Sequence, residues 1–158
     1  MTSDAVGPLG IYRDRVEAQY GEGDRYEAAL KLMIAERRLT NTITNVIKQY
    51  GLNRAQWSVL TILHLSSDDS IPLGRIAHAL SVHGTNITNA VDKLIDQGLA
   101  ERVLDPKDRR SVRATITPAG AAASDEILRA LAQEKFGLAS LTNERLGQLA
   151  RVLDDVTL

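Results

Sequence analysis

The feature that most constrains the fold is one pair of short extended segments in a chain that otherwise reads as helical. The two segments span residues 100–104 and 111–117, and the residues between them open with Asp105-Pro106, a pair that favours a turn. In the second segment apolar and polar residues alternate, so one face can pack on helices while the other stays polar. The sequence therefore predicts a mainly α fold with a small β-hairpin.

Two short helices are expected directly before this hairpin. Apolar residues at helical spacing predict one helix over residues 73–80 and a second over 84–97, with Gly98 placed as a left-handed C-terminal cap. Residues 81–83 leave room only for a tight connection between the two helices. A helix-turn-helix followed at once by a hairpin is a winged helix-turn-helix, which we assign to residues 73–117.

Longer helices flank this motif on both sides. Apolar residues recur there at the three- and four-residue spacing that is typical of amphipathic helices. Asn53 is a candidate N-cap, and Thr117 followed by Pro118 is a strong helix start. We expect these flanking helices over residues 24–50, 53–66, 118–138 and 141–156.

Composition excludes several classes of protein. The chain of 158 residues has no Cys, so disulfides, thiolate metal sites and cysteine nucleophiles are excluded. No stretch approaches the ~18 consecutive apolar residues of a membrane span, and residues 1–10 do not resemble a secretion signal. We therefore expect a cytoplasmic protein without a membrane contact.

The three histidines do not form a catalytic or metal-binding constellation. His64, His78 and His83 are scattered, and neither a Gly-x-Ser-x-Gly elbow nor a phosphate-binding glycine loop accompanies them. We therefore expect no enzyme, no cofactor and no resident metal. A metal-responsive regulator stays open as an alternative, although His78 and His83 alone supply too few ligands.

Positive charge is concentrated at the turn of the hairpin. The net charge of the chain is −1, so any attraction to nucleic acid must be local, and residues 107–113 hold four basic residues and a single acid. A basic hairpin beside a major-groove helix can place arginine in the minor groove. A solvated turn, or a winged helix that contacts another protein, is the alternative. The candidate wing contacts are Lys107, Asp108, Arg109, Arg110 and Arg113, with Asp108 orienting Arg110.

The helix over residues 84–97 carries short hydrogen-bonding side chains near its N-terminal end. Asn can pair with adenine, and Thr can bond to bases or contact a thymine methyl group. Asp92 and Asp96 share this polar face and would repel phosphates, unless Asp92 pairs with an arginine of its own domain. The candidate DNA contacts of this helix are Thr85, Asn86, Thr88, Asn89 and Lys93.

Four segments together resemble the signature of the MarR family of transcriptional regulators. They are GTNITNAVDKL (84–94), GLAER (98–102), DPKDRR (105–110) and ITPAG (116–120). The resemblance implies a homodimer with interlocked terminal helices, bound to a palindromic double-stranded DNA operator and acting as a repressor. It divides the chain into residues 1–50 for dimerisation, 51–117 for DNA binding and 118–158 for dimerisation again.

Residues 11–20 resemble the extra N-terminal helix of the urate-responsive branch of this family. Tyr20 stands where that branch has Trp and Ser58 where it has Asp, while Arg102 matches, so we transfer the architecture and not the ligand. Because family members commonly bind small aromatic or phenolic compounds, the resemblance implies a repressor that a small ligand releases, with anionic aromatic compounds as candidates. The candidate pocket residues are Tyr20, Tyr50, Trp57, Ser58, His64 and Arg102, and core packing is the alternative for Tyr50, Trp57 and His64.

Overall fold

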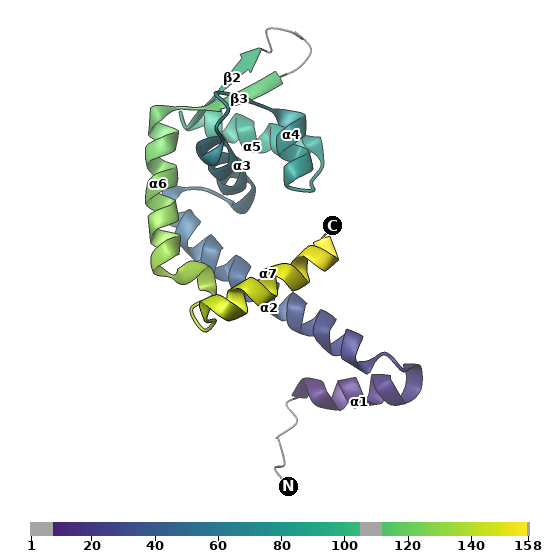
Figure 1. The fold of residues 1–158 in the computed structure, drawn as a ribbon. Coiled ribbons are helices and arrows are strands. Elements are labelled where there is room, and N and C mark those ends of the chain that lie inside the picture. Colours follow the sequence, from purple (N-terminus) through teal and green to yellow (C-terminus); the bar gives the residue numbers. More distant parts are fainter. Residues whose placement is uncertain (1–7, 105–111, 158) are drawn as a thin grey trace. The chain divides into compact units, whose positions relative to one another are not determined.

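The computed structural model describes residues 8–104 and 112–157 (Figure 1). The chain divides into two compact units, residues 1–41 and 42–158, and α2 runs across the boundary between them. The predicted mainly α fold with a β-hairpin is confirmed. The elements are α1 (Pro8–Tyr20), α2 (Gly23–Ile47), η1 (Lys48–Tyr50), α3 (Arg54–Leu65), β1 (Ile71–Pro72), α4 (Leu73–Ala79), α5 (Gly84–Asp96), β2 (Ala100–Leu104), β3 (Val112–Ile116), α6 (Pro118–Gln133), η2 (Lys135–Gly137) and α7 (Asn143–Thr157).

The predicted hairpin belongs to a small antiparallel sheet with the strand order β1-β3-β2. Strands β2 and β3 pair with each other, and β1 adds to the other edge of β3 with Ile71 opposite Ala114. Ala114 is fully buried, as the predicted alternation along this strand requires. The sequence analysis did not foresee β1, because two residues are too few to show an alternation.

Two helices begin at the predicted caps. Asn53 Oδ1 accepts the Gln56 N–H at 3.0 Å, and Gln56 Oε1 accepts the Asn53 N–H at 2.8 Å, which forms a reciprocal capping box at the start of α3. Thr117 Oγ1 accepts the Gly120 N–H at 3.0 Å and donates to the Gly98 carbonyl at 2.8 Å. The Thr117 hydroxyl therefore starts α6 and ties it to the turn that follows α5.

Two helices end differently from the prediction. The last turn of α2 tightens into the 3-10 helix Lys48–Tyr50, which is closed by Gly51 in the left-handed region with φ of 70°. Helix α6 ends at Gln133, short of the expected residue 138, because Lys135 and Phe136 have φ of 48° and 51°, which an α-helix does not accommodate. The prediction that α6 continues to residue 138 was therefore wrong.

One apolar core holds unit 2 together, with side chains from α2, α3, α4, α5, α6 and the sheet. Helix α5 contributes Ile87, Ala90, Val91 and Leu94, which are at most 5% exposed. Burying a large aliphatic side chain of this kind is worth about 1.5–3 kcal/mol. Because these residues repeat on one face of the helix, their burial directs the opposite, polar face of α5 to the surface.

Candidate nucleic-acid interface

The surface of α5 carries the side chains that the sequence predicts to contact DNA. Thr88 is half-buried, and its Oγ1 donates to the Gly84 carbonyl at 3.2 Å. The other four are exposed: Thr85, Asn86, Asn89 and Lys93. This face therefore presents amide and hydroxyl groups of the kind that pair with base edges in the major groove.

Both acidic residues of α5 are paired within the same unit. Asp92 Oδ1 lies 2.6 Å from Nη2 of Arg102 on β2, and Asp96 Oδ2 lies 3.2 Å from Nζ of Lys93. Of the two alternatives that the sequence leaves open for Asp92, the structure thus shows the pair with an arginine of its own domain. Each pair reduces the repulsion that the carboxylate would exert on a nearby phosphate. The Asp92–Arg102 pair also joins α5 to the first strand of the hairpin.

The basic turn of the hairpin lies outside the described residues. The predicted wing contacts within it are Lys107, Asp108, Arg109 and Arg110. Arg113, the remaining predicted wing contact, is half-buried on β3. Its guanidinium donates from Nε to Ser70 Oγ at 2.8 Å and from Nη2 to the Ser70 carbonyl. The Arg113 side chain thus contacts the loop after α3.

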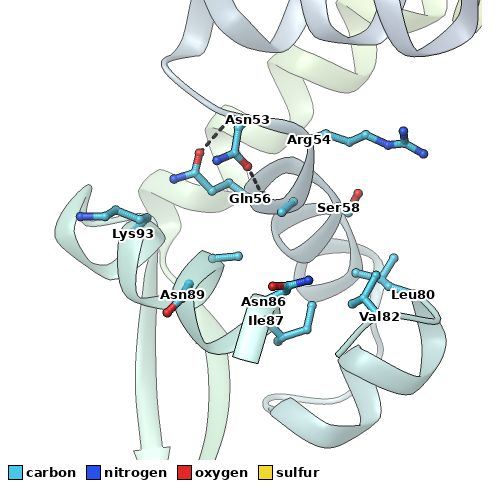
Figure 2. Close-up of a pocket in the computed structure, with 12 residues that line it drawn as sticks. Asn53, Arg54, Gln56, Ser58, Leu80, Val82, Asn86, Ile87, Asn89 and Lys93 are labelled. Carbon is cyan, nitrogen blue, oxygen red and sulfur yellow. Dashed lines mark hydrogen bonds between the residues drawn. The ribbon is translucent and has the colours of Figure 1, made fainter. Parts of the chain in front are cut away.

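A pocket of about 520 Å³ lies beside α5 (Figure 2). Residues of α5 line one side, and the N-terminal part of α3 and the segment after α4 line the rest. Asn86, Asn89 and Lys93 belong both to this pocket and to the exposed face of α5. The sequence does not reveal the pocket, because a hollow formed by two helices and the segment between α4 and α5 leaves no pattern along the chain.

Of the residues predicted to bind a ligand, only Ser58 lines this pocket. Tyr50 and Trp57 are half-buried and pack against the apolar core. His64 Nε2 lies 2.9 Å from Asp125 Oδ1 on α6. These contacts give Tyr50, Trp57 and His64 packing and pairing roles within unit 2, and their part in ligand binding stays a prediction.

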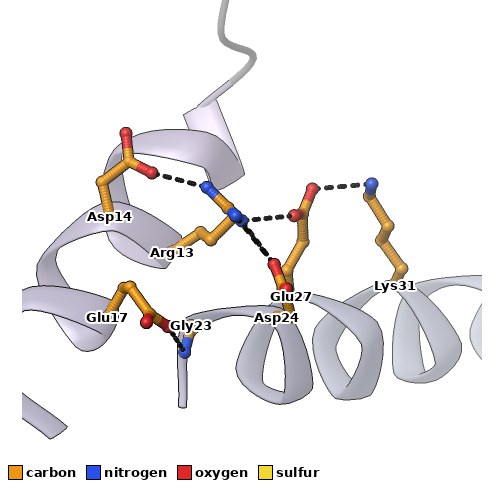
Figure 3. Close-up of polar contacts among 7 residues, drawn as sticks. All are labelled: Arg13, Asp14, Glu17, Gly23, Asp24, Glu27 and Lys31. Atoms are coloured by element: carbon orange, nitrogen blue, oxygen red, sulfur yellow. Dashed lines mark hydrogen bonds and ion pairs between the residues drawn. The ribbon is translucent and has the colours of Figure 1, made fainter. Parts of the chain in front are cut away.

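Tyr20, the last predicted ligand residue, belongs to unit 1 and is 68% exposed at the end of α1. Charged contacts join α1 to α2 (Figure 3): Arg13 Nε donates to Asp24 Oδ1 at 2.9 Å, and Glu17 accepts the Gly23 N–H at 2.8 Å. The hydrogen bond to Asp24 raises the pKa of Arg13 above its ordinary value. A Cβ on Gly23 would lie 2.7 Å from the Arg13 carbonyl oxygen, so the two helices meet closely. The N-terminal helix that the resemblance implied is therefore present.

Within residues 8–104 and 112–157, no three His, Asp or Glu side chains gather as they would around a metal ion. No helix there combines the length and the apolar character needed to cross a membrane.

The helix-turn-helix, the hairpin and the polar face of α5 define a winged helix-turn-helix protein, a class of nucleic-acid-binding fold. The sequence model of the MarR family matches residues 50–111. Among curated relatives, an uncharacterized HTH-type transcriptional regulator of Bacillus subtilis, YkoM, is 35% identical over 51% of this chain and 51% of its own length. The HTH-type transcriptional regulator PrsX of Escherichia coli is 29% identical over 54% of this chain and 52% of its own. The chain thus spans about half the length of the curated relatives it matches.

Solved structures cover more of the chain. Sco5413, a MarR family transcriptional regulator from Streptomyces coelicolor, is 31% identical, with a TM-score of 0.74 over 82% of this chain and 89% of its own. A mutant MarR from E. coli in complex with operator DNA gives a TM-score of 0.73 at 20% identity, over 90% of this chain and 98% of its own, a likeness of fold alone. The chain belongs to the MarR family of transcriptional regulators.

Proposed function

We propose that this chain regulates transcription by binding double-stranded DNA sequence-specifically, with α5 as the recognition helix and the hairpin as the wing. The observation that carries the proposal is the surface of α5, where short amide and hydroxyl side chains are exposed and both acids are paired. The relatives named as transcriptional regulators support it. So do the DNA complexes solved for E. coli MarR and for S. aureus MepR.

The proposal includes a homodimer, with residues 1–50 and 118–158 for dimerisation and 51–117 for DNA binding. Both terminal regions leave large apolar side chains at the surface, as interfaces commonly do. Examples are Ile11, Tyr12, Leu32, Met33, Val152 and Val156. A symmetric dimer would present two recognition helices about 34 Å apart to a palindromic operator. Since such a regulator acts on the chromosome, a cytoplasmic location belongs to the proposal.

Salt dependence and the loss of one wing arginine test the DNA-binding proposal. Affinity for an operator duplex is expected to fall steeply with salt, with a log–log slope near −0.9 for each neutralised phosphate. Arg110→Ala should weaken binding by about 1–3 kcal/mol, the range of one good groove contact. Fluorescence anisotropy titrations measure both quantities.

The matched control for this variant is Arg129→Ala. The Arg129 side chain is 74% exposed on α6, outside residues 51–117, and its removal should leave the affinity unchanged once gel filtration shows the same oligomeric state. A flat salt dependence would favour a module that contacts another protein. Equal affinities of the Arg110 variant and the unchanged chain would refute the assigned role of the wing.

We also propose that the regulator is a repressor released by a small anionic aromatic compound. The pocket beside α5 supports this, because a ligand held by Asn86, Asn89 and Lys93 would compete with DNA for the same side chains. Arg54 and Lys93 supply positive charge for an anionic group. The apolar lining that suits an aromatic ring comes from Leu80, Val82, Ile87 and Ala90.

Filling the pocket tests the proposed effector site. Ser58→Phe places a ring in the pocket, so operator affinity should stop responding to substituted benzoates, whatever its value in their absence. The control is His78→Phe, at an exposed position on α4 away from the pocket, which should respond as the unchanged chain does. Anisotropy titrations with a panel of benzoates provide the readout. A Ser58→Phe variant that keeps the full response would exclude this pocket as the effector site.

A further inference from the structure

The second strand of the hairpin is attached to the loop between α3 and β1, residues 66–70. Arg113 on β3 donates from Nε to Ser70 Oγ at 2.8 Å and from Nη2 to the Ser70 carbonyl oxygen. A single guanidinium thus holds the side chain and the backbone of the same residue. Two positions further along β3, Thr115 Oγ1 donates to the Asp69 carbonyl at 2.6 Å. Both outward-facing side chains of this strand therefore bind the loop.

The loop itself is fixed to the helices beside it. The Ser66 N–H donates to the Ile62 carbonyl of α3 at 3.1 Å, and the Asp68 carboxylate pairs with Arg75 on α4. Directly after the loop, Ile71 pairs with Ala114 of β3. The loop therefore connects α3 and α4, which pack on the recognition helix, to the strand that leads into the wing.

A wing needs such a support, because an isolated two-stranded hairpin is only marginally stable in water. Strand β1 supports β3 over two residues only, at Ala114 and Arg113. On the other strand, Arg102 pairs with Asp92 of α5 at 2.6 Å. The hairpin is thus held on both sides, by Arg102 on β2 and by Arg113 on β3.

We propose that Arg113 is a positioning residue, which sets the direction of the wing by fixing β3 to the 66–70 loop. This replaces the direct DNA contact that the sequence suggested for Arg113, since its guanidinium is directed at Ser70. The inference rests on the proposed function, because it concerns how the same DNA interface is held in place. The basis of the proposal is geometric. The planar guanidinium of Arg113 donates to two acceptors of one residue, an arrangement that the single ammonium group of Lys does not reproduce.

Arg113→Lys distinguishes a positioning role from a direct phosphate contact, because the substitution keeps the positive charge and removes the planar guanidinium. A residue that attracts phosphate by charge would tolerate Lys, whereas a residue that positions the wing would not. We expect Arg113→Lys to lower operator affinity about tenfold, the loss that corresponds to 1.4 kcal/mol. Ser70→Ala removes one of the two acceptors, so it should shift affinity in the same direction by less.

Hydroxyl-radical footprinting of the operator complex supplies a readout that a general loss of stability would not move. We expect Arg113→Lys to lose protection of the minor groove where the wing lies and to keep the protection around the recognition helix. The double variant Ser70→Ala/Arg113→Lys should bind no more weakly than Arg113→Lys alone, since both changes break the same contact. Thermal melting of each variant checks that it is folded.

Two results would overturn the proposal. The first is an Arg113→Lys variant whose operator affinity and wing footprint are unchanged. A direct phosphate contact would then also show in Arg113→Gln, because the log–log slope of affinity against salt would fall by the contribution of about one phosphate. The other is simple additivity of the Ser70 and Arg113 effects. Arg129→Lys, at an exposed arginine of α6, is the control for the loss of a guanidinium, and gel filtration checks that this variant has the same oligomeric state as the wild-type chain. Failure of the unchanged chain to bind any duplex would instead refute the proposed function.

Discussion

Gly120→Ala is expected to destabilise the protein by at least about 3 kcal/mol, at or above the upper end of ordinary overpacking effects. A Cβ at this position would lie 2.0 Å from the Leu99 carbonyl oxygen and 2.9 Å from Ile116 Cγ1. The Leu99 carbonyl cannot easily move away, because it accepts the Thr117 N–H at 3.2 Å. Gly120 itself is buried and donates to Thr117 Oγ1. The first turn of α6 therefore crosses the start of the hairpin at a distance that only glycine allows.

Urea unfolding followed by circular dichroism measures this effect. The matched control is Gly74→Ala on α4, where an added Cβ would meet nothing within 4 Å beyond its chain neighbours and the backbone of its own helix. In a helix, replacing Gly by Ala at an unobstructed position stabilises by roughly 0.5–1 kcal/mol. The two substitutions should thus change the free energy of unfolding in opposite directions. A Gly120→Ala variant as stable as the unchanged chain would contradict the close crossing of α6 over the hairpin.

Arg102→Met is expected to weaken operator binding by about 3 kcal/mol in the dimer, or more than a hundredfold. The substitution leaves Asp92 without its 2.6 Å partner beside the face of α5 that we propose to contact DNA. Truncating one partner of a fully buried charge pair in an interface costs about 2–5 kcal/mol. The two side chains here are 44% and 45% exposed, so we assign a smaller loss of about 1.5 kcal/mol to each protomer.

Asp92→Asn tests whether the unpaired carboxylate causes this loss of operator affinity. If repulsion between the unpaired carboxylate and phosphates accounts for the loss, then Asp92→Asn in the Arg102→Met chain should recover most of the affinity. The Asp92→Asn change alone leaves Arg102 unpaired, so the same electrostatics should keep or raise operator affinity. Anisotropy titrations of the four chains form a double-mutant cycle. Equal affinities of Arg102→Met with and without Asp92→Asn would show that the carboxylate is not the cause.

The parts of the fold that the sequence predicted are those with a strong local pattern. The stripe of Ile87, Ala90, Val91 and Leu94 repeats on one helical face, so both the helix and its exposed polar face followed from spacing alone. Asn53 and Thr117 were recognised as caps because the cap chemistry lies within three residues of each helix start. The pairing of Asp92 was foreseen only as an option, since the sequence does not tell which arginine is near.

The features that the sequence did not predict depend on contacts between distant parts of the chain. Arg113 and Ser70 lie 43 positions apart, and nothing in the spacing of either residue shows that they meet. An arginine next to a basic turn therefore suggested a DNA contact from charge alone. The pocket beside α5 likewise needs Ser58 and Asn89 from different helices. His64 was considered for a ligand, whereas its partner Asp125 comes from α6.

Selection from a random library of DNA duplexes by the purified full chain tests the central claim most directly. Bound duplexes are recovered, amplified and sequenced over several rounds, with non-specific competitor DNA present. The account predicts enrichment of an inverted repeat whose half-site centres lie about one helical turn apart, as two recognition helices of a dimer require. A library that shows no enriched motif after successive rounds would contradict the claim that this winged helix-turn-helix reads DNA sequence.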